Sequence, residues 1–142
     1  PIPMLFQKPL TLKNTVNYNY QILQKIKKHH INKDWFNKFN LAKLENQKIN
    51  SLSGGEKQKL FLARLMSFDQ LNLFLDEPNQ SLDLESERLL VDLLLYEKKN
   101  KTIILTLHDF EIAKKIGDYF IYLENGSTVE KGVVLPSSLA SK

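Results

Sequence analysis

The 142-residue sequence contains no cysteine, which excludes a disulfide framework and any metal site built on thiolates. No apolar run approaches the ~18–20 residues that a membrane-spanning helix needs. The longest candidates are YFIYL and LLVDLLLY, which Asp92 interrupts. Glycine is scarce, with five in the chain. A hydrophobic fraction of 42% nevertheless suits one domain, or a large part of one, with a buried core.

The charged residues are divided unevenly along the chain. Residues 1–50 carry nine lysines and two acids, whereas residues 51–142 carry eleven basic and fourteen acidic residues. A basic half can face nucleic acid or an anionic membrane surface. A solvated lysine-rich surface explains the same pattern, so charge alone does not choose a function.

Apolar periodicity and turn residues predict a mainly parallel α/β arrangement in the second half and a mostly helical first half. The predicted helices cover Asn14–Lys28 (capped by Asn14), Asp34–Phe39, Leu41–Leu44, a Ser53-capped segment to Phe68, Leu84–Lys99 and Phe110–Ile116. The predicted strands are Ile2–Phe6, Leu71–Leu75 and Lys101–Leu107, with a hairpin from Tyr119–Glu124 to Ser127–Lys131 across Asn125-Gly126. Glu45–Asn50 is predicted to be a loop.

Two consecutive glycines, Gly54 and Gly55, stand in the first turn of the helix that Ser53 caps. Glycine costs roughly 0.5–1 kcal/mol against alanine inside a helix. A helix N-terminus offers unpaired N–H groups and a partial positive charge, and a phosphate can approach it where side chains are missing. The stretch therefore predicts a phosphate site, to which the Ser53 hydroxyl adds a donor, although an ordinary capped helix explains SGG alone.

An Asp-Glu pair ends the apolar strand LNLFLDEP, at the strand end where parallel α/β proteins place ligands. Neighbouring strand residues point to opposite sides, so we expect Asp76 and Glu77 to have different roles. One carboxylate can hold Mg²⁺ through water, and the other can activate a water for attack on a phosphoryl group. Taken alone, such a pair is more often a solvated turn.

Two further groups follow the acidic pair. Asp83 is predicted to cap the helix that begins at Leu84, and His108 ends the strand KTIILTLHD at the expected sheet edge of Asp76 and Glu77. A lone histidine in such a place is usually structural; near phosphate its imidazole can hold the attacking water. A nucleophilic serine triad is excluded, because no serine stands on a nucleophile elbow.

In this order and spacing, LSGGEKQ, LNLFLDEP, SLD and LHD resemble the C-terminal two-thirds of an ATP-binding cassette (ABC) ATPase. The resemblance identifies the signature motif as Leu52–Gln58, the Walker B strand as Leu71–Glu77, the D-loop as Ser81–Asp83, the switch histidine as His108 and the Q-loop glutamine as Gln7. It implies an α/β fold, a partial RecA-like P-loop NTPase core with a mainly parallel sheet and an ABC helical subdomain.

The resemblance also implies the role of each site residue. Glu77 and His108 would be catalytic, and Asp76 and Gln7 would hold Mg²⁺. The nucleotide-binding set would be Ser53, Gly54, Gly55, Glu56, Gln7 and Asp83. In this family two cassettes pair head to tail around ATP, so the signature residues would meet the γ-phosphate held by the partner.

Several features depart from the family pattern. Asn79 stands where threonine or serine is common, and Leu107 replaces the usual threonine before the histidine. No G-x-x-x-x-G-K-[ST] motif, which grips the β- and γ-phosphates, is present. The chain thus resembles a cassette without its N-terminal lobe, and we expect it to be inactive alone. The expected limits are 1–8 for the core lobe and Q-loop, 9–68 for the helical subdomain, 69–135 for the core and 136–142 for a tail.

The function implied is the ATP-hydrolysing subunit of a membrane importer, most similar to bacterial oxyanion importers of the tungstate type. It implies a second cassette, permease subunits and an extracytoplasmic substrate-binding protein as partners, at the cytoplasmic face of the membrane. An ABC-type ATPase acting on nucleic acid or the ribosome is an alternative, but the compact stretch between Gln7 and Leu52 lacks coiled-coil heptads and no nucleic acid is expected. A non-hydrolytic half-cassette is a third interpretation. The presence of both Glu77 and His108 argues against it, because these residues serve hydrolysis.

Overall fold

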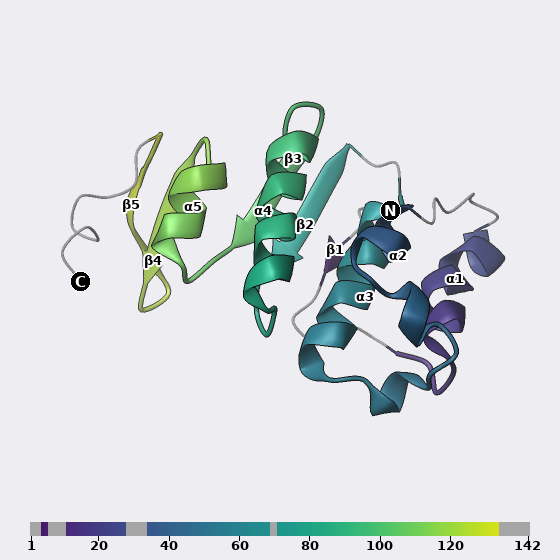
Figure 1. Cartoon of the computed structure of the whole chain (residues 1–142). Coiled ribbons are helices and arrows are strands. Elements are labelled where there is room, and N and C mark those ends of the chain that lie inside the picture. Colours follow the sequence, from purple (N-terminus) through teal and green to yellow (C-terminus); the bar gives the residue numbers. More distant parts are fainter. Residues whose placement is uncertain (1–3, 6–10, 28–33, 69–70, 134–142) are drawn as a thin grey trace. The chain divides into compact units, whose positions relative to one another are not determined.

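The computed structural model describes residues 4–5, 11–27, 34–68 and 71–133 (Figure 1). The chain divides into two compact units, residues 1–106 and residues 107–142, and each is described by itself. The boundaries predicted from the sequence, at residues 8, 68 and 135, follow family motifs and not compactness, and they stay a prediction. In the described ranges no helix is long and apolar enough to cross a membrane.

A three-stranded parallel sheet organises the first unit. Its strands are β1 (Met4–Leu5), β2 (Asn72–Asp76) and β3 (Thr102–Thr106), in the order β1-β2-β3. The register places Leu75 opposite Leu105 and Asp76 opposite Thr106. In the middle strand Leu73 and Leu75, which point to the same face of the sheet, are buried, and Phe74 on the other face is partly exposed. The acidic end of this strand lies at the carboxyl edge of the sheet.

Helices supply most of the buried side chains of the first unit. They are α1 (Val16–Lys27), α2 (Asp34–Lys38), α3 (Gly54–Met66) and α4 (Leu84–Glu97), with 3₁₀ turns at Ala42–Leu44 and Ile49–Ser51. In Figure 1, α1 and α2 lie against α3, whose buried side chains include Leu60 and Leu62. Tyr20 of α1 packs its ring on Phe36 of α2, with centroids 4.8 Å apart. The α3 helix is therefore the centre of the helical packing.

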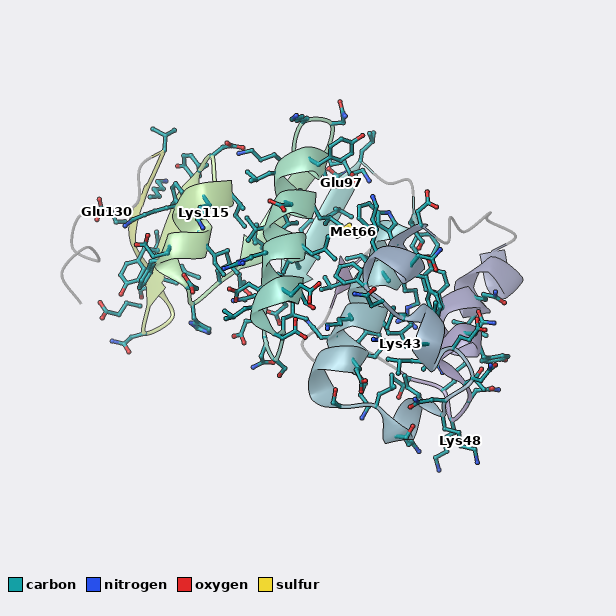
Figure 2. All side chains as sticks on the ribbon, viewed as in Figure 1. Lys43, Lys48, Met66, Glu97, Lys115 and Glu130 are labelled. Carbon is teal, nitrogen blue, oxygen red and sulfur yellow. The ribbon has the colours of Figure 1, made fainter. Side chains whose placement is uncertain are left out.

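An ion pair joins the end of α4 to the start of β3. The Lys101 ammonium lies 2.6 Å from the Glu97 carboxylate, and both side chains are largely buried, at 12% and 11% exposure. Figure 2 labels Glu97 at this end of α4. The pair thus ties the last turn of α4 to the residue before β3.

The second unit contains α5 (Phe110–Ile116) and the antiparallel strands β4 (Phe120–Glu124) and β5 (Ser127–Gly132). Asp109 caps α5, since its carboxylate accepts from the amides of Glu111 and Ile112. Asn125 and Gly126 both have positive φ, at 50° and 77°, as a type I′ turn requires. The hairpin predicted from Asn-Gly is confirmed.

The predicted cap Asn14 was wrong, and the predicted loop Glu45–Asn50 was correct only up to Lys48. Thr15, not Asn14, caps α1, because its hydroxyl accepts from the amide of Tyr18. The predicted loop at residues 45–50 runs into the 3₁₀ turn, where Ile49 is 1% exposed. The amide of Ile49 donates to the Asn14 carbonyl, and Thr15 pairs with Lys48. Tertiary pairing between these two segments therefore overrides the local polar signal.

Candidate functional site

The N-terminus of α3 is closed by a capping box. The Ser53 hydroxyl accepts from the amide of Glu56 at 3.2 Å, and the Glu56 carboxylate accepts from the amide and the hydroxyl of Ser53 at 2.8 and 2.9 Å. Donation from the Ser53 amide, followed by that from its hydroxyl, lowers the pKa of the Glu56 carboxyl. Within the chain, Ser53 thus already donates to Glu56, and Glu56 orders the helix start.

The two glycines of the first turn meet different surroundings. A Cβ atom on Gly54 would come no closer than 3.8 Å to the side chain of Ser81, which is ordinary contact. A Cβ atom on Gly55 would lie 2.6 Å from the Ser81 carbonyl oxygen. Gly55 is thus required by packing inside the chain. Of the two glycines, only the exposed Gly54 can still be explained by a need to keep the helix end clear for a ligand.

We expect Gly55→Ala to be less stable than Gly54→Ala by about 1–3 kcal/mol, the usual cost of forcing an extra methyl group into a packed contact. Both changes add the same group to the same helical turn, so helix propensity cancels between them. Urea unfolding of the complete protein that contains this sequence measures the difference. Equal stability of the two variants would show that the Ser81 backbone yields and that packing does not select Gly55.

Two side chains of α3 hold the segment that follows β2. The buried Gln58 amide donates to the carbonyl of Pro78 at 3.1 Å, and the Lys59 ammonium lies 2.7 Å from the Asp83 carboxylate. The sequence analysis included Gln58 in the motif Leu52–Gln58 but gave it no role of its own. The sequence did contain a signal for it, because a glutamine among the leucines of a helix is buried with them and then needs a hydrogen-bond partner. The α3 helix and the turn after β2 are therefore joined by side-chain bonds within one unit.

Asp83 is bonded through both carboxylate oxygens. One oxygen accepts from Lys59, and the other accepts from the amide of Ser86 at 2.8 Å, which confirms the predicted cap of α4. The Lys59 bond, followed by those from Ser86, holds the pKa of the Asp83 carboxyl far below its usual range. Its nucleotide-binding role stays a prediction, to which the structure adds a capping role.

The acidic pair at the end of β2 is bridged by a threonine that the sequence interpretation missed. The Thr106 hydroxyl donates to Asp76 Oδ1 at 2.7 Å and accepts from the amide of Glu77 at 3.0 Å. Glu77 has a φ of 44°, in the left-handed region that non-glycine residues rarely adopt. Such backbone is common at functional sites, where the surroundings hold it in place. The available signal was that both strands end at the same edge of the sheet.

Two of the predicted residues, His108 and Gln7, are not placed relative to this pair. His108 belongs to the second unit, just before the cap of α5, so its expected place beside Asp76 and Glu77 stays a prediction. Gln7 lies outside the described residues.

The Asp76 carboxylate, half-buried at the sheet edge, is an oxygen donor of the kind that suits Mg²⁺ held partly through water. Among the described residues no group of three or more His, Cys, Asp or Glu could hold a metal.

Comparison with known proteins decides the family. Residues 1–80 match the family model described as ABC transporter. The chain belongs to this family. The match confirms the predicted family. The likeness extends to solved structures of ATP-binding cassettes, which confirms the predicted RecA-like fold class.

Among curated ABC proteins, the tungstate uptake system ATP-binding protein TupC of Peptoclostridium acidaminophilum is 33% identical over 140 residues, covering 91% of this chain and 64% of TupC. The phosphonates import ATP-binding protein PhnC of Fusobacterium nucleatum is 42% identical over 91 residues, covering 63% of this chain and 37% of PhnC. The chain thus spans less than two thirds of either relative.

Two solved cassettes share the fold of this ABC chain. A dimeric post-hydrolysis state of an ATP-binding cassette, bound to ADP and Pi, superposes with a TM-score of 0.75 at 26% identity and covers 93% of this chain. An ATP-binding subunit of an ABC transporter superposes with a TM-score of 0.84 at 20% identity and covers 94%. This chain covers 62% and 59% of the two neighbours, respectively.

Proposed function

We propose that this chain is part of the ATP-binding and ATP-hydrolysing subunit of an ABC importer, which drives transport by ATP-dependent pairing of two cassettes. The observation that carries the proposal is that the exposed helix start at Gly54 is tied to the segment that directly follows Asp76 and Glu77. Gln58, Lys59 and the close approach of Gly55 to Ser81 hold the two elements together. The exposed helix start suits a phosphate held by the partner cassette, and the carboxylate pair suits the phosphates bound by this cassette.

Each residue has a stated task in this proposal. Glu77 orients and activates the attacking water, and Asp76, with Gln7, holds Mg²⁺. When bound, the ion neutralises charge on the phosphates. Ser53 and Gly54 meet the γ-phosphate of the nucleotide bound by the partner cassette.

In this proposal His108 holds the terminal phosphate and the attacking water. Gly55, Glu56 and Asp83 support the start of α3, so that Ser53 and Gly54 are held in place for the partner's nucleotide. A P-loop from outside these 142 residues is needed to grip the nucleotide. We therefore expect hydrolysis from the complete protein, and none from these 142 residues alone.

The substrate that we propose is an oxyanion. Support comes from relatives whose names state tungstate uptake, phosphonate import and, in Pyrobaculum aerophilum, phosphate import. The proposed partners are a second copy of the subunit, permease subunits and an extracytoplasmic substrate-binding protein, at the cytoplasmic face of the membrane. The exposed lysines Lys43 and Lys48, labelled in Figure 2, add positive charge suited to an anionic membrane surface.

The complete protein, reconstituted with its permease in lipid vesicles, tests this function. We expect ATP hydrolysis to require Mg²⁺ and to drive accumulation of tungstate, with phosphate and phosphonate as comparison substrates. Hydrolysis stimulated by DNA or ribosomes and not by the permease would favour the nucleic-acid alternative. Absence of hydrolysis from the reconstituted complex would favour the non-hydrolytic half-cassette.

A further inference from the structure

We propose that Thr106 is a positioning residue for the Asp76–Glu77 pair. Its single hydroxyl fixes a carboxylate oxygen of Asp76 and, at the same time, the backbone amide of Glu77. The inference rests on the proposed function, since it concerns how those two carboxylates are held for ATP hydrolysis. It assigns a role to a strand residue that precedes His108 by two positions.

Sheet register brings the three residues together. Thr106 and Asp76 are paired across the parallel strands β3 and β2, at the last residue of each strand. A hydroxyl group has one proton to donate and lone pairs with which to accept. Here it donates to Asp76 Oδ1 at 2.7 Å and accepts from the Glu77 amide at 3.0 Å. Two adjacent acidic residues are therefore linked through one oxygen atom of a neighbouring strand.

The bond from the Glu77 amide to Thr106 acts at a residue whose backbone conformation is energetically unfavourable. Glu77 has a φ of 44°, and its carbonyl accepts from the amide of Gln80 at 3.1 Å. The next carbonyl, that of Pro78, accepts from Gln58. Thr106 supplies the bond on the amide side of Glu77, so the left-handed residue is held from before and after. This arrangement fixes the direction in which the Glu77 side chain leaves the main chain.

The bond to Asp76 acts on the side chain. A carboxylate whose one oxygen accepts a short hydrogen bond has its rotation restricted, which orients the group toward a metal or its bound water. Loss of this bond leaves the carboxylate in place but frees its rotation. The predicted consequence falls on the chemical step and on Mg²⁺, and not on nucleotide binding, which is assigned to other residues.

The decisive variants in the complete protein are Thr106→Val and Thr106→Ser. Valine keeps the shape and the strand preference of threonine, so the sheet is retained while the hydroxyl is lost. We expect T106V to lower kcat and to raise the Mg²⁺ concentration for half-maximal hydrolysis, each by about ten-fold, the usual size of an effect on an outer partner of a metal ligand. KM for ATP should change less than two-fold. T106S should restore kcat and the Mg²⁺ response.

The matched control is Thr102→Val, which removes an exposed hydroxyl from the same strand and the same side, four residues earlier. T102V should leave all three kinetic quantities unchanged. A separate readout needs neither nucleotide nor metal. Hydrogen exchange of the Glu77 amide should be faster in T106V than in the wild type, and slow again in T106S.

The outcomes separate the two proposals. Suppose that the wild-type protein hydrolyses ATP and that T106V matches it in kcat, in Mg²⁺ response and in hydrogen exchange of the Glu77 amide. That result would overturn the role of Thr106 and leave the proposed function standing. Equal losses in T106V and T106S, or a loss confined to KM, would overturn it as well, because the hydroxyl would then not be the group that matters. A complete protein without any hydrolysis would overturn the proposed function and this inference together.

Discussion

Replacing Glu77 by glutamine in the complete protein is expected to abolish ATP hydrolysis and to leave ATP-bound cassette dimers that do not reopen. Glutamine keeps the size of the side chain and the hydrogen bonds of its backbone, but its amide cannot take a proton from the attacking water. Loss of a general base typically costs about 10²–10⁴-fold in rate. Phosphate release measures the loss, and size-exclusion chromatography with ATP and Mg²⁺ measures the dimers.

Glu85→Gln is the matched control for this experiment. Glu85 lies in the first turn of α4 and is exposed, so the same loss of one negative charge occurs in the same unit, away from the end of β2. The control should hydrolyse ATP at the wild-type rate and should reopen after hydrolysis. Normal turnover in Glu77→Gln would remove the catalytic role from Glu77.

The second large effect is expected at Gly54. A Gly54→Asp variant places a carboxylate at the exposed helix start, where no atom blocks a side chain closer than 3.8 Å. An acidic residue in the first turn favours the helix through its dipole, so the protein should remain at least as stable. Repulsion between carboxylate and phosphate should prevent the ATP-dependent dimer, with turnover reduced by 100-fold or more, on the order of 3 kcal/mol.

Gly54→Asn separates charge from bulk, since asparagine has the same shape as aspartate without its charge. We expect it to lose less activity than Gly54→Asp, and we expect both variants to unfold at the wild-type urea concentration. Dimerisation with ATP is measured for each by light scattering. Unchanged turnover in Gly54→Asp would remove the role in the partner's nucleotide site that is proposed for the signature helix.

Local patterns in the sequence predicted most of the elements correctly. The cap at Ser53, the cap at Asp83 and the turn at Asn125-Gly126 each depend on bonds between residues at most three positions apart. Such bonds form wherever the right side chains follow one another, so they can be read without a fold. The family motifs are equally local, and the order in which they occur was enough to indicate an ABC cassette.

Contacts between distant segments decided the rest. Gly55 is required by the Ser81 carbonyl, and Thr106 bonds Asp76 from a strand 30 residues further along the chain. The end of the predicted loop Glu45–Asn50 was misjudged for the same reason, because the amide of Ile49 bonds to Asn14, just before α1. These contacts depend on strand register and helix packing. The sequence by itself thus determined which chemical groups the chain carries, and the tertiary structure decided which of them touch, because register and packing are set by the whole core and not by neighbouring residues.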